Sequence, residues 1–397
     1  MKSIEVSQSH TRLRFALFIF FIVLGIVSLG IGMFSLLRQD TGWQTIELQS
    51  GEELLGGDIV LEYNIGQSGT AAMLEYREVS RIYTDTANRL YKLLDGTKYF
   101  ADTTNLYSIS KSPNQTLTLD GALYQALSLL CEKGGRSLYL APVHAQYLSV
   151  MHSQDDYWAA LQDPSKSEEV ADYVDELIGF VSSSAHIELS FLGENKVQLF
   201  VSDTYLAFAQ ENGIDAFLDF GWYKNAFLVD GIAQALTEEG HTLGVVASYD
   251  GFTRNLDASG QSYSLNLYSR QGNEISLPAR FSYTGAATLV SLRDYVLSTN
   301  DEHRIYIYED GTSVTLYIDD TDGRAKVAAH ELVALSKSQS CAEVALSIAP
   351  VYIAQSLDTS ALQALQSQGI TSVYFIDGTA QSTDPALVIE EGWMPPS

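Results

Sequence analysis

The sequence contains little cysteine and few charged residues for its length. Only Cys131 and Cys341 occur among 397 residues, and no CxxC pair or neighbouring histidine accompanies them. This excludes a zinc ribbon, an iron–sulfur cluster and a disulfide scaffold. Charged residues make up 18% of the chain and hydrophobic residues 46%. The composition therefore excludes a disordered protein and provides enough apolar side chains for a large buried core.

Basic residues are also scarce compared with acidic ones. The chain has 23 lysines and arginines against 49 aspartates and glutamates, a formal net charge of -26. Such a surface repels a phosphate backbone, which excludes general nucleic-acid binding. Residues 1–38 hold four of the bases and one acid, so the remainder has 19 bases against 48 acids. We expect this remainder to stand away from anionic lipid head groups.

Generic catalytic motifs are missing from the sequence. It contains no GxxxxGK[ST], HExxH or GxSxG, and no GxGxxG that opens a helix. Ser108 and Lys111 match the SxxK of serine acyl-enzymes, in which the lysine accepts the serine proton, but no KTG follows. Asp319–Gly323 resembles a calcium loop without glycine at its sixth position, which favours an acidic turn between strands.

One long apolar run lies near the start of the chain. Phe15–Leu37 comprises 23 residues without a charge. At ~1.5 Å per residue, this run is long enough to cross a hydrocarbon layer of ~30 Å. Bases precede the run and acids follow it. This asymmetry predicts a single-pass protein of the cell membrane, with its N-terminus in the cytoplasm and its main domain outside.

These features divide the N-terminal part into three segments. We expect residues 1–14 to be a cytoplasmic N-terminus, residues 15–37 a transmembrane signal anchor and residues 38–54 a stalk. A buried core helix and a cleaved signal peptide are the alternatives. The run exceeds the usual ~7–15-residue apolar region of a signal peptide, and no small-x-small cleavage site follows Met33. An uncleaved anchor is therefore favoured.

The rest of the chain mixes strand and helix patterns. Alternating apolar residues predict a hairpin over 187–201, and further strands at 59–63, 243–249, 262–267, 304–308, 314–318 and 371–376. Helical spacing predicts helices at 86–94, 119–132, 228–239 and 341–354. Asp120 is the expected cap of the second of these helices, and Pro350 is expected to kink or shorten the last. The pattern predicts an α+β, or mixed α/β, domain.

Seven segments resemble, in the same order, the motifs of a known family. They are FADTTNLYSIS at 100–110, CEKGGRSLYLAPVHAQY at 131–147, FLVDGIAQAL at 227–236, ASYDGF at 247–252, SLRDY at 291–295, LYIDDTDGR at 316–324 and CAEVALSIA at 341–349. The order and spacing resemble the extracytoplasmic FAD:protein FMN transferases, the ApbE family. The resemblance implies one large T-fold-type domain over residues 55–380, with residues 381–397 as a C-terminal tail.

The resemblance also implies a reaction. In this family, the hydroxyl of a threonine on a flavin-accepting protein attacks the FMN phosphorus of FAD and releases AMP, with Mg²⁺ on the pyrophosphate. The implied cofactors are therefore FAD, as the substrate, and Mg²⁺. The implied partner is a membrane or extracytoplasmic protein that accepts the flavin.

Site residues follow by position from the same resemblance. Glu343 and Ser347 stand where the family has its metal-binding aspartate and threonine. Positions i and i+4 share one face of a helix, so both oxygens can reach one cation. Gly231 is implied as a further contributor to the metal site. The residues implied for contact with the flavin nucleotide are Gly231, Asp250, Gly251, Ser291 and Asp319.

Several positions depart from the family pattern. Gln234 stands in place of the family lysine, Tyr317 in place of the histidine, and residues 136–140 lack the expected acid. No catalytic residue is therefore assigned. Two functions stay open, an active flavin transferase and a catalytically inactive relative that binds a flavin, another ligand or a partner protein. The departures favour the second function, whereas the acid and hydroxyl at Glu343 and Ser347 favour the first.

Overall fold

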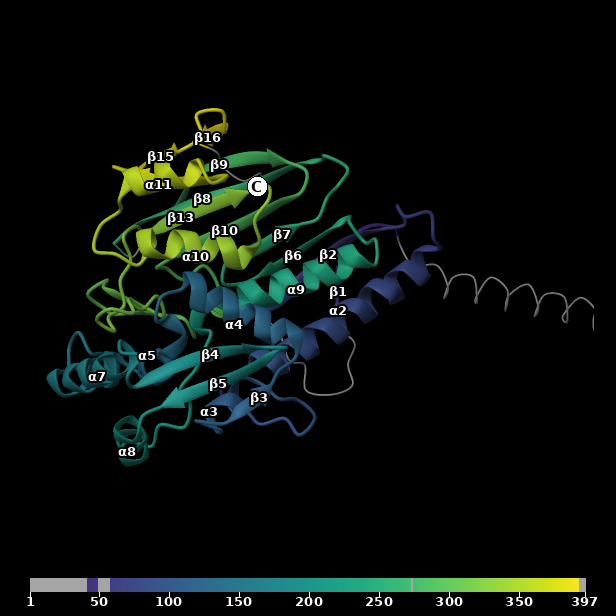
Figure 1. Cartoon of the computed structure of the whole chain (residues 1–397). Helices are drawn as coiled ribbons and strands as arrows, with labels where there is room; N and C mark the ends of the chain where they lie inside the picture. Colours follow the sequence, from purple (N-terminus) through teal and green to yellow (C-terminus); the bar gives the residue numbers. More distant parts are fainter. Residues whose placement is uncertain (1–40, 49–57, 273, 393–397) are drawn as a thin grey trace, which may run out of the picture.

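The computed structural model describes residues 41–48, 58–272 and 274–392 (Figure 1). The predicted transmembrane anchor at 15–37 lies outside these residues, as do residues 38–40 and 49–54 of the predicted stalk, whereas its residues Gly42–Ile46 form a strand of the main sheet and no stalk. Within the described part of the chain, none of the helices combines the length and the apolar character needed to cross a membrane.

An eight-stranded sheet organises the domain. Each pair of neighbouring strands in it is antiparallel. In order across the sheet, the strands are β1 (Gly42–Ile46), β2 (Ile59–Ile65), β6 (Gly244–Ser248), β7 (Phe252–Asn255), β10 (Ala287–Arg293), β13 (Glu331–Ser336), β14 (Ile370–Ile376) and β15 (Thr379–Ser382).

Both faces of the central strands are covered. On one face, Val290 and Leu292 of β10 join the main hydrophobic core. Four helices pack there, namely α2 (Ala72–Leu94), α9 (Lys224–Glu238), α10 (Cys341–Tyr352) and α11 (Thr359–Gln366). On the other face, Leu289 joins a smaller core with Phe281. That face is covered by β8 (Ser262–Gln271) and β9 (Glu274–Thr284), which form a three-stranded sheet with β16 (Ile389–Glu391).

A second group of elements lies below the sheet in Figure 1. It contains a small sheet of β3 (Thr116–Thr118), β5 (Lys196–Val201) and β4 (Ile187–Gly193). Around it are α3 (Leu106–Ser110), α4 (Gly121–Lys133), η1 (Ser137–Tyr139), α5 (Ala141–Met151), α6 (Asp156–Gln162), α7 (Glu168–Val181) and α8 (Asp203–Glu211). The connections to the main sheet include η2 (Gly221–Tyr223), η3 (Thr299–Asp301), β11 (Ile305–Ile307) and β12 (Ser313–Thr315).

The prediction of a mixed fold is confirmed, as are most of the predicted elements. The hairpin at 187–201 forms, and Asp120 caps α4 by accepting a hydrogen bond from the backbone N–H of Ala122. Two elements are longer than predicted, since α2 begins at Ala72 and β8 continues to Gln271. The last predicted helix, at 341–354, forms as Cys341–Tyr352 and continues past Pro350, so the proline lies inside the helix and does not end it.

The carboxylate of Asp230 on α9 joins three parts of the fold. It accepts hydrogen bonds from the backbone N–H groups of Cys341 and Ala342, each at 2.8 Å, at the start of α10. It also accepts a hydrogen bond at 2.9 Å from Arg254 on β7. Figure 1 shows α9 and α10 along the same face of the sheet. The segments around Asp230 and Cys341, which lie far apart in the sequence, are therefore in contact in the fold.

Gly251, in the turn between β6 and β7, generates a stability prediction. Its φ is +103°, and a Cβ there would lie 2.0 Å from the carbonyl oxygen of Ser291. Gly251→Ala should therefore cost about 3 kcal/mol or more, from backbone strain and overpacking together. The control Gly240→Ala has a similar φ of +85° with no atom within 4 Å, and should cost about 1 kcal/mol. Urea unfolding of both variants measures the difference, and equal losses would contradict the close approach.

Candidate functional site

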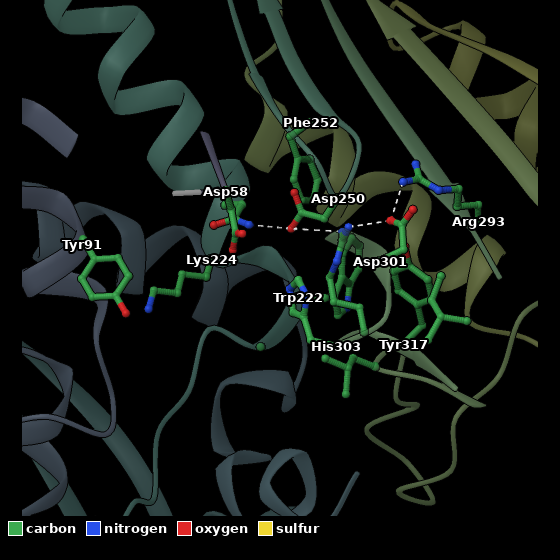
Figure 2. Close-up of a pocket in the computed structure, with 15 residues that line it drawn as sticks. Asp58, Tyr91, Trp222, Lys224, Asp250, Phe252, Arg293, Asp301, His303 and Tyr317 are labelled. Atoms are coloured by element: carbon green, nitrogen blue, oxygen red, sulfur yellow. Dashed lines mark hydrogen bonds and ion pairs between the residues drawn. The ribbon is translucent and has the colours of Figure 1, made fainter. Parts of the chain in front are cut away.

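The candidate site is a cavity of about 360 Å³ at the ends of central strands of the main sheet. It is lined by side chains from α2, from η2 and the start of α9, from the turn between β6 and β7, and from the stretch between the end of β10 and Tyr317. Figure 2 shows Trp222, Phe252 and Tyr317 near its centre, with Arg293 and Asp301 on one side and Lys224 beside Tyr91 on the other. Its charged residues are Asp58, Lys224, Asp250, Arg293, Asp301 and Arg304, together with His303.

Aromatic rings form the wall of this cavity. Trp222 lies nearly parallel to Phe252, with an interplanar angle of 15° and ring centroids 6.2 Å apart. Tyr317 meets Trp222 edge-on at 5.2 Å, and burial raises the pKa of its hydroxyl. A Cβ at Gly221, whose φ is +54°, would lie 2.3 Å from the His144 ring. Glycine is therefore required immediately before Trp222.

Two arginines share one buried carboxylate at the opposite end. Asp301 is 1% exposed, and its Oδ1 accepts hydrogen bonds from Arg293 and Arg304, each at 2.6 Å. Its Oδ2 accepts hydrogen bonds from the backbone N–H groups of Leu297 at 2.9 Å and Ser298 at 3.1 Å. These four bonds hold Asp301 in place, so both guanidinium groups are fixed at the cavity wall.

The two guanidinium groups keep hydrogen-bonding capacity. Nε of Arg293 and Nε of Arg304 are both buried, and neither has a hydrogen-bond partner within the described ranges. Burial alone would lower the pKa of Arg293, but the neighbouring Asp301 raises it above its usual value. Burial lowers the pKa of Arg304. Both remain charged, because a guanidinium is not deprotonated in proteins.

Asp250 reaches the cavity from the turn between β6 and β7. Its carboxylate accepts hydrogen bonds from Asn225, at 2.8 Å, and from the Ser248 hydroxyl. Arg304 lies 4.0 Å from it as an ion pair. Three acids and three permanent bases therefore line the cavity, in a chain where acids outnumber bases about two to one.

The fold resembles that of several solved proteins. The ApbE protein of Thermotoga maritima superposes with a TM-score of 0.58 at 10% identity, over 88% of this chain and 97% of that one. The flavin transferase ApbE of Vibrio cholerae gives 0.54 at 11%, over 86% and 96%. The apo form of the flavinyl transferase ApbE of Pseudomonas stutzeri gives 0.51 at 13%, over 86% and 93%. This chain has an ApbE-like fold.

The sequence comparisons add no family assignment. No protein-family model matches the chain, and no curated protein matches it. At identities of 10% to 13%, the likeness to the ApbE structures shows the fold alone.

The ApbE-like fold brings together only some of the predicted flavin-contact residues. Asp250 lines the cavity. Gly251 and Ser291 lie beside it, because the Ser291 N–H donates to the Gly251 carbonyl at 2.9 Å. Gly231 lies elsewhere, within α9, where an added Cβ would be 2.4 Å from Leu90 of α2. Its missing side chain therefore allows two helices to approach each other, which corrects the predicted approach to a ligand.

Asp319 lies in a different cavity, beside α10. It accepts hydrogen bonds from the Lys326 ammonium at 2.6 Å and from the backbone N–H of Thr321 at 2.9 Å. Partial burial would raise the pKa of Asp319, but these partners lower it overall. This cavity, of about 350 Å³, is also lined by Leu346 and Pro350. α10 therefore lies beside the turn at 319–323, and the turn is the acidic turn that its sequence favours.

The residues implied for Mg²⁺ do not fit a metal site in this arrangement. The Glu343 carboxylate accepts a hydrogen bond from the Ser340 N–H at 2.9 Å and closes the capping box of α10. The Ser347 hydroxyl donates to the Glu343 backbone carbonyl at 2.7 Å. Gly231 packs against Leu90. Among the residues that the structure describes, no group of three His, Cys, Asp or Glu side chains is placed to hold a metal ion.

The residues that depart from the family pattern have structural partners. Gln234 is exposed on α9 and donates to Glu238 at 2.7 Å. Arg136 donates to the Val181 carbonyl and to Glu188, each at 2.7 Å. Tyr317 alone among these positions lines the candidate cavity.

The SxxK pattern is structural as well. The Ser108 hydroxyl donates to Asn105 at 2.9 Å within the capping box of α3. Lys111 forms an ion pair with Asp215. Both residues therefore have roles other than those of an acyl-enzyme pair.

Most residues of the cavity were missed by the sequence analysis. Trp222, Lys224, Asp301 and Arg304 belong to none of the seven family-like segments, and Arg293 lies in one of them, SLRDY at 291–295, without being an expected site residue. One available signal was the run GWYKN at 221–225, which places an aromatic and a basic residue just before a predicted helix. The other signal was the presence of two arginines, Arg293 and Arg304, within a short stretch of a chain that has few basic residues.

The capping role of Glu343 generates a second prediction. Glu343→Ala should lower the free energy of unfolding by about 1 kcal/mol, because the capping box of α10 is lost. Glu343→Gln should change it by less than about 0.5 kcal/mol, because glutamine also occupies this position in capping boxes. Urea unfolding and Mg²⁺ calorimetry in the presence of FAD test this. Abolition of Mg²⁺ binding in Glu343→Gln, with stability unchanged, would show a metal ligand instead.

Proposed function

We propose that this protein binds a flavin nucleotide in the candidate cavity and acts as a binding protein rather than as a flavin transferase. The observation that carries the proposal is the combination of an aromatic wall at Trp222 and Phe252 with the arginine pair at Asp301, within an ApbE-like fold. The predicted anchor at residues 15–37 would place this domain outside the membrane, where a membrane or extracytoplasmic flavoprotein is the proposed partner.

The chemistry of a flavin nucleotide matches the two ends of the cavity. Its isoalloxazine ring is planar and aromatic, so it gains from offset stacking or edge-to-face contact with Trp222 and Tyr317. Its phosphate is an anion, and guanidinium groups bind phosphate in a fixed fork geometry. Lys224, whose Nζ lies 4.2 Å from the Tyr91 ring centroid, adds a cation at the aromatic end.

Two observations favour binding over transfer. The family lysine and histidine positions are occupied by Gln234 and Tyr317, which have no cationic side chain. The residues implied for the metal are used in a helix cap, a backbone hydrogen bond and a helix contact. Transferase chemistry depends on neutralising phosphate charge at the reacting centre. In this chain, the cationic side chains of the cavity are not at the family positions. Two of them, Arg293 and Arg304, flank Asp301 instead.

Flavin fluorescence tests the proposed function. FAD added to the protein should be bound, and Trp222→Ala should weaken binding about tenfold or more, since stacking on an aromatic side chain is worth about 1–3 kcal/mol. The matched control is Trp158→Ala, because Trp158 is 53% exposed on α6 and lies outside the cavity. AMP should not accumulate when Mg²⁺ and a threonine-containing acceptor are added. Absence of FAD binding would refute the proposal, and AMP release with acceptor labelling would establish the transferase instead.

A further inference from the structure

The arginine pair has a geometry that one ligand group can bridge. Arg293 and Arg304 both donate to the same oxygen of Asp301 at 2.6 Å, so the two donating nitrogens are no more than twice that distance apart. Arg293 also donates to the Tyr249 carbonyl at 3.0 Å, and Arg304 to the Asn300 carbonyl at 3.2 Å. Each guanidinium group is therefore held in one orientation by protein acceptors, before any ligand is present.

The pair is also little exposed to solvent. Both arginines donate to the carboxylate of Asp301, and Arg304 forms a further ion pair with Asp250 at 4.0 Å. The side chains of Arg293 and Arg304 are only 12% and 17% exposed, so water screens them little. Their Nε atoms are among the buried polar atoms that have no hydrogen-bond partner within the described residues. Buried donors of this kind carry a desolvation cost that an anionic acceptor would remove.

We infer that Arg293 and Arg304 form the phosphate subsite of the cavity and hold the ligand's phosphate directly, without a divalent cation. This inference rests on the proposed function and deepens it, since it makes the site selective for phosphorylated flavins. It also accounts for the disagreement between the ApbE-like fold and the residues at the implied metal position. Charge-assisted hydrogen bonds from two fixed guanidinium groups replace the cation that would otherwise neutralise the phosphate.

The test compares FMN with riboflavin, which lacks the phosphate, by fluorescence titration of the full-length protein in EDTA. FMN should bind about tenfold tighter than riboflavin or more, the factor expected from a charged hydrogen bond. Added Mg²⁺ should leave this ratio unchanged. Inorganic phosphate should compete with FMN and leave riboflavin binding unaffected, which separates the phosphate group from the ring as the source of the preference.

Single substitutions test whether the preference for FMN over riboflavin comes from Arg293 and Arg304. In Arg304→Gln, Asp301 keeps Arg293 and its two backbone donors, so the fold is expected to persist. FMN affinity should fall toward the riboflavin value, because one of the two guanidinium groups is lost, and an unchanged riboflavin affinity confirms that the cavity is intact. Arg304→Lys should give an intermediate FMN affinity, because it keeps the charge and loses the fork. The matched control is Arg324→Gln, which removes an arginine paired with Asp175 at 2.7 Å outside the cavity.

The outcomes separate the inference from the proposed function. Equal affinities for FMN and riboflavin, or an FMN preference that appears only with Mg²⁺, would overturn the phosphate subsite while flavin binding stands. If neither flavin binds, the proposed function fails. In that case, calorimetry with inorganic pyrophosphate tests whether the arginine pair binds a phosphate group without a flavin ring. Binding that Arg304→Gln abolishes and Arg324→Gln retains would support it, and no binding would overturn it.

Discussion

The carboxylate of Asp230 is the interaction on which the rest of the structure depends. It occupies the start of α10, where two backbone N–H groups need acceptors and the helix dipole favours a negative charge. The same carboxylate accepts a hydrogen bond from Arg254 on β7. One side chain of α9 therefore fixes α10 and the sheet relative to each other. The α9 helix begins directly after Trp222 and Tyr223, so the position of the aromatic wall follows from this contact.

The candidate cavity differs in charge from the protein around it. The chain carries a formal charge of -26, yet Lys224, Arg293 and Arg304 balance the three acids of the cavity. A strongly acidic domain repels an anionic ligand at long range, so local cations are needed to bind one. Asp301 fixes two of these cations and neutralises only one charge. The resulting site favours a ligand with a planar ring at one end and a phosphate at the other.

The sequence predicted some elements and missed others, among them the helices α7 and α11 and two central strands. The hairpin at 187–201 and the cap of α4 were correct, because one face of each element is exposed and its pattern is periodic. Strands β10 and β13 were not predicted, because both of their faces are buried and apolar residues fill successive positions. The cavity was missed for another reason. Many residues of the cavity lie in or next to connections between helices and strands. The spacing of motifs along the chain does not predict which of these connections are close together in the fold. Asp250 was predicted because it lies in a turn that resembles a family motif.

A crystal structure of the protein with FMN tests the account most directly, because expected flavin-contact residues lie in two different cavities, Asp250 in one and Asp319 in the other. The account predicts the isoalloxazine ring against Trp222 and Tyr317, and the phosphate within hydrogen-bond distance of the guanidinium group of Arg293 or Arg304, with no metal ion between them. The contrary result is FMN in the second cavity, beside Asp319 and Leu346 of α10, with a cation held by Glu343 and Ser347. That position would restore the metal-dependent site implied by the sequence and would remove the arginine pair from ligand binding.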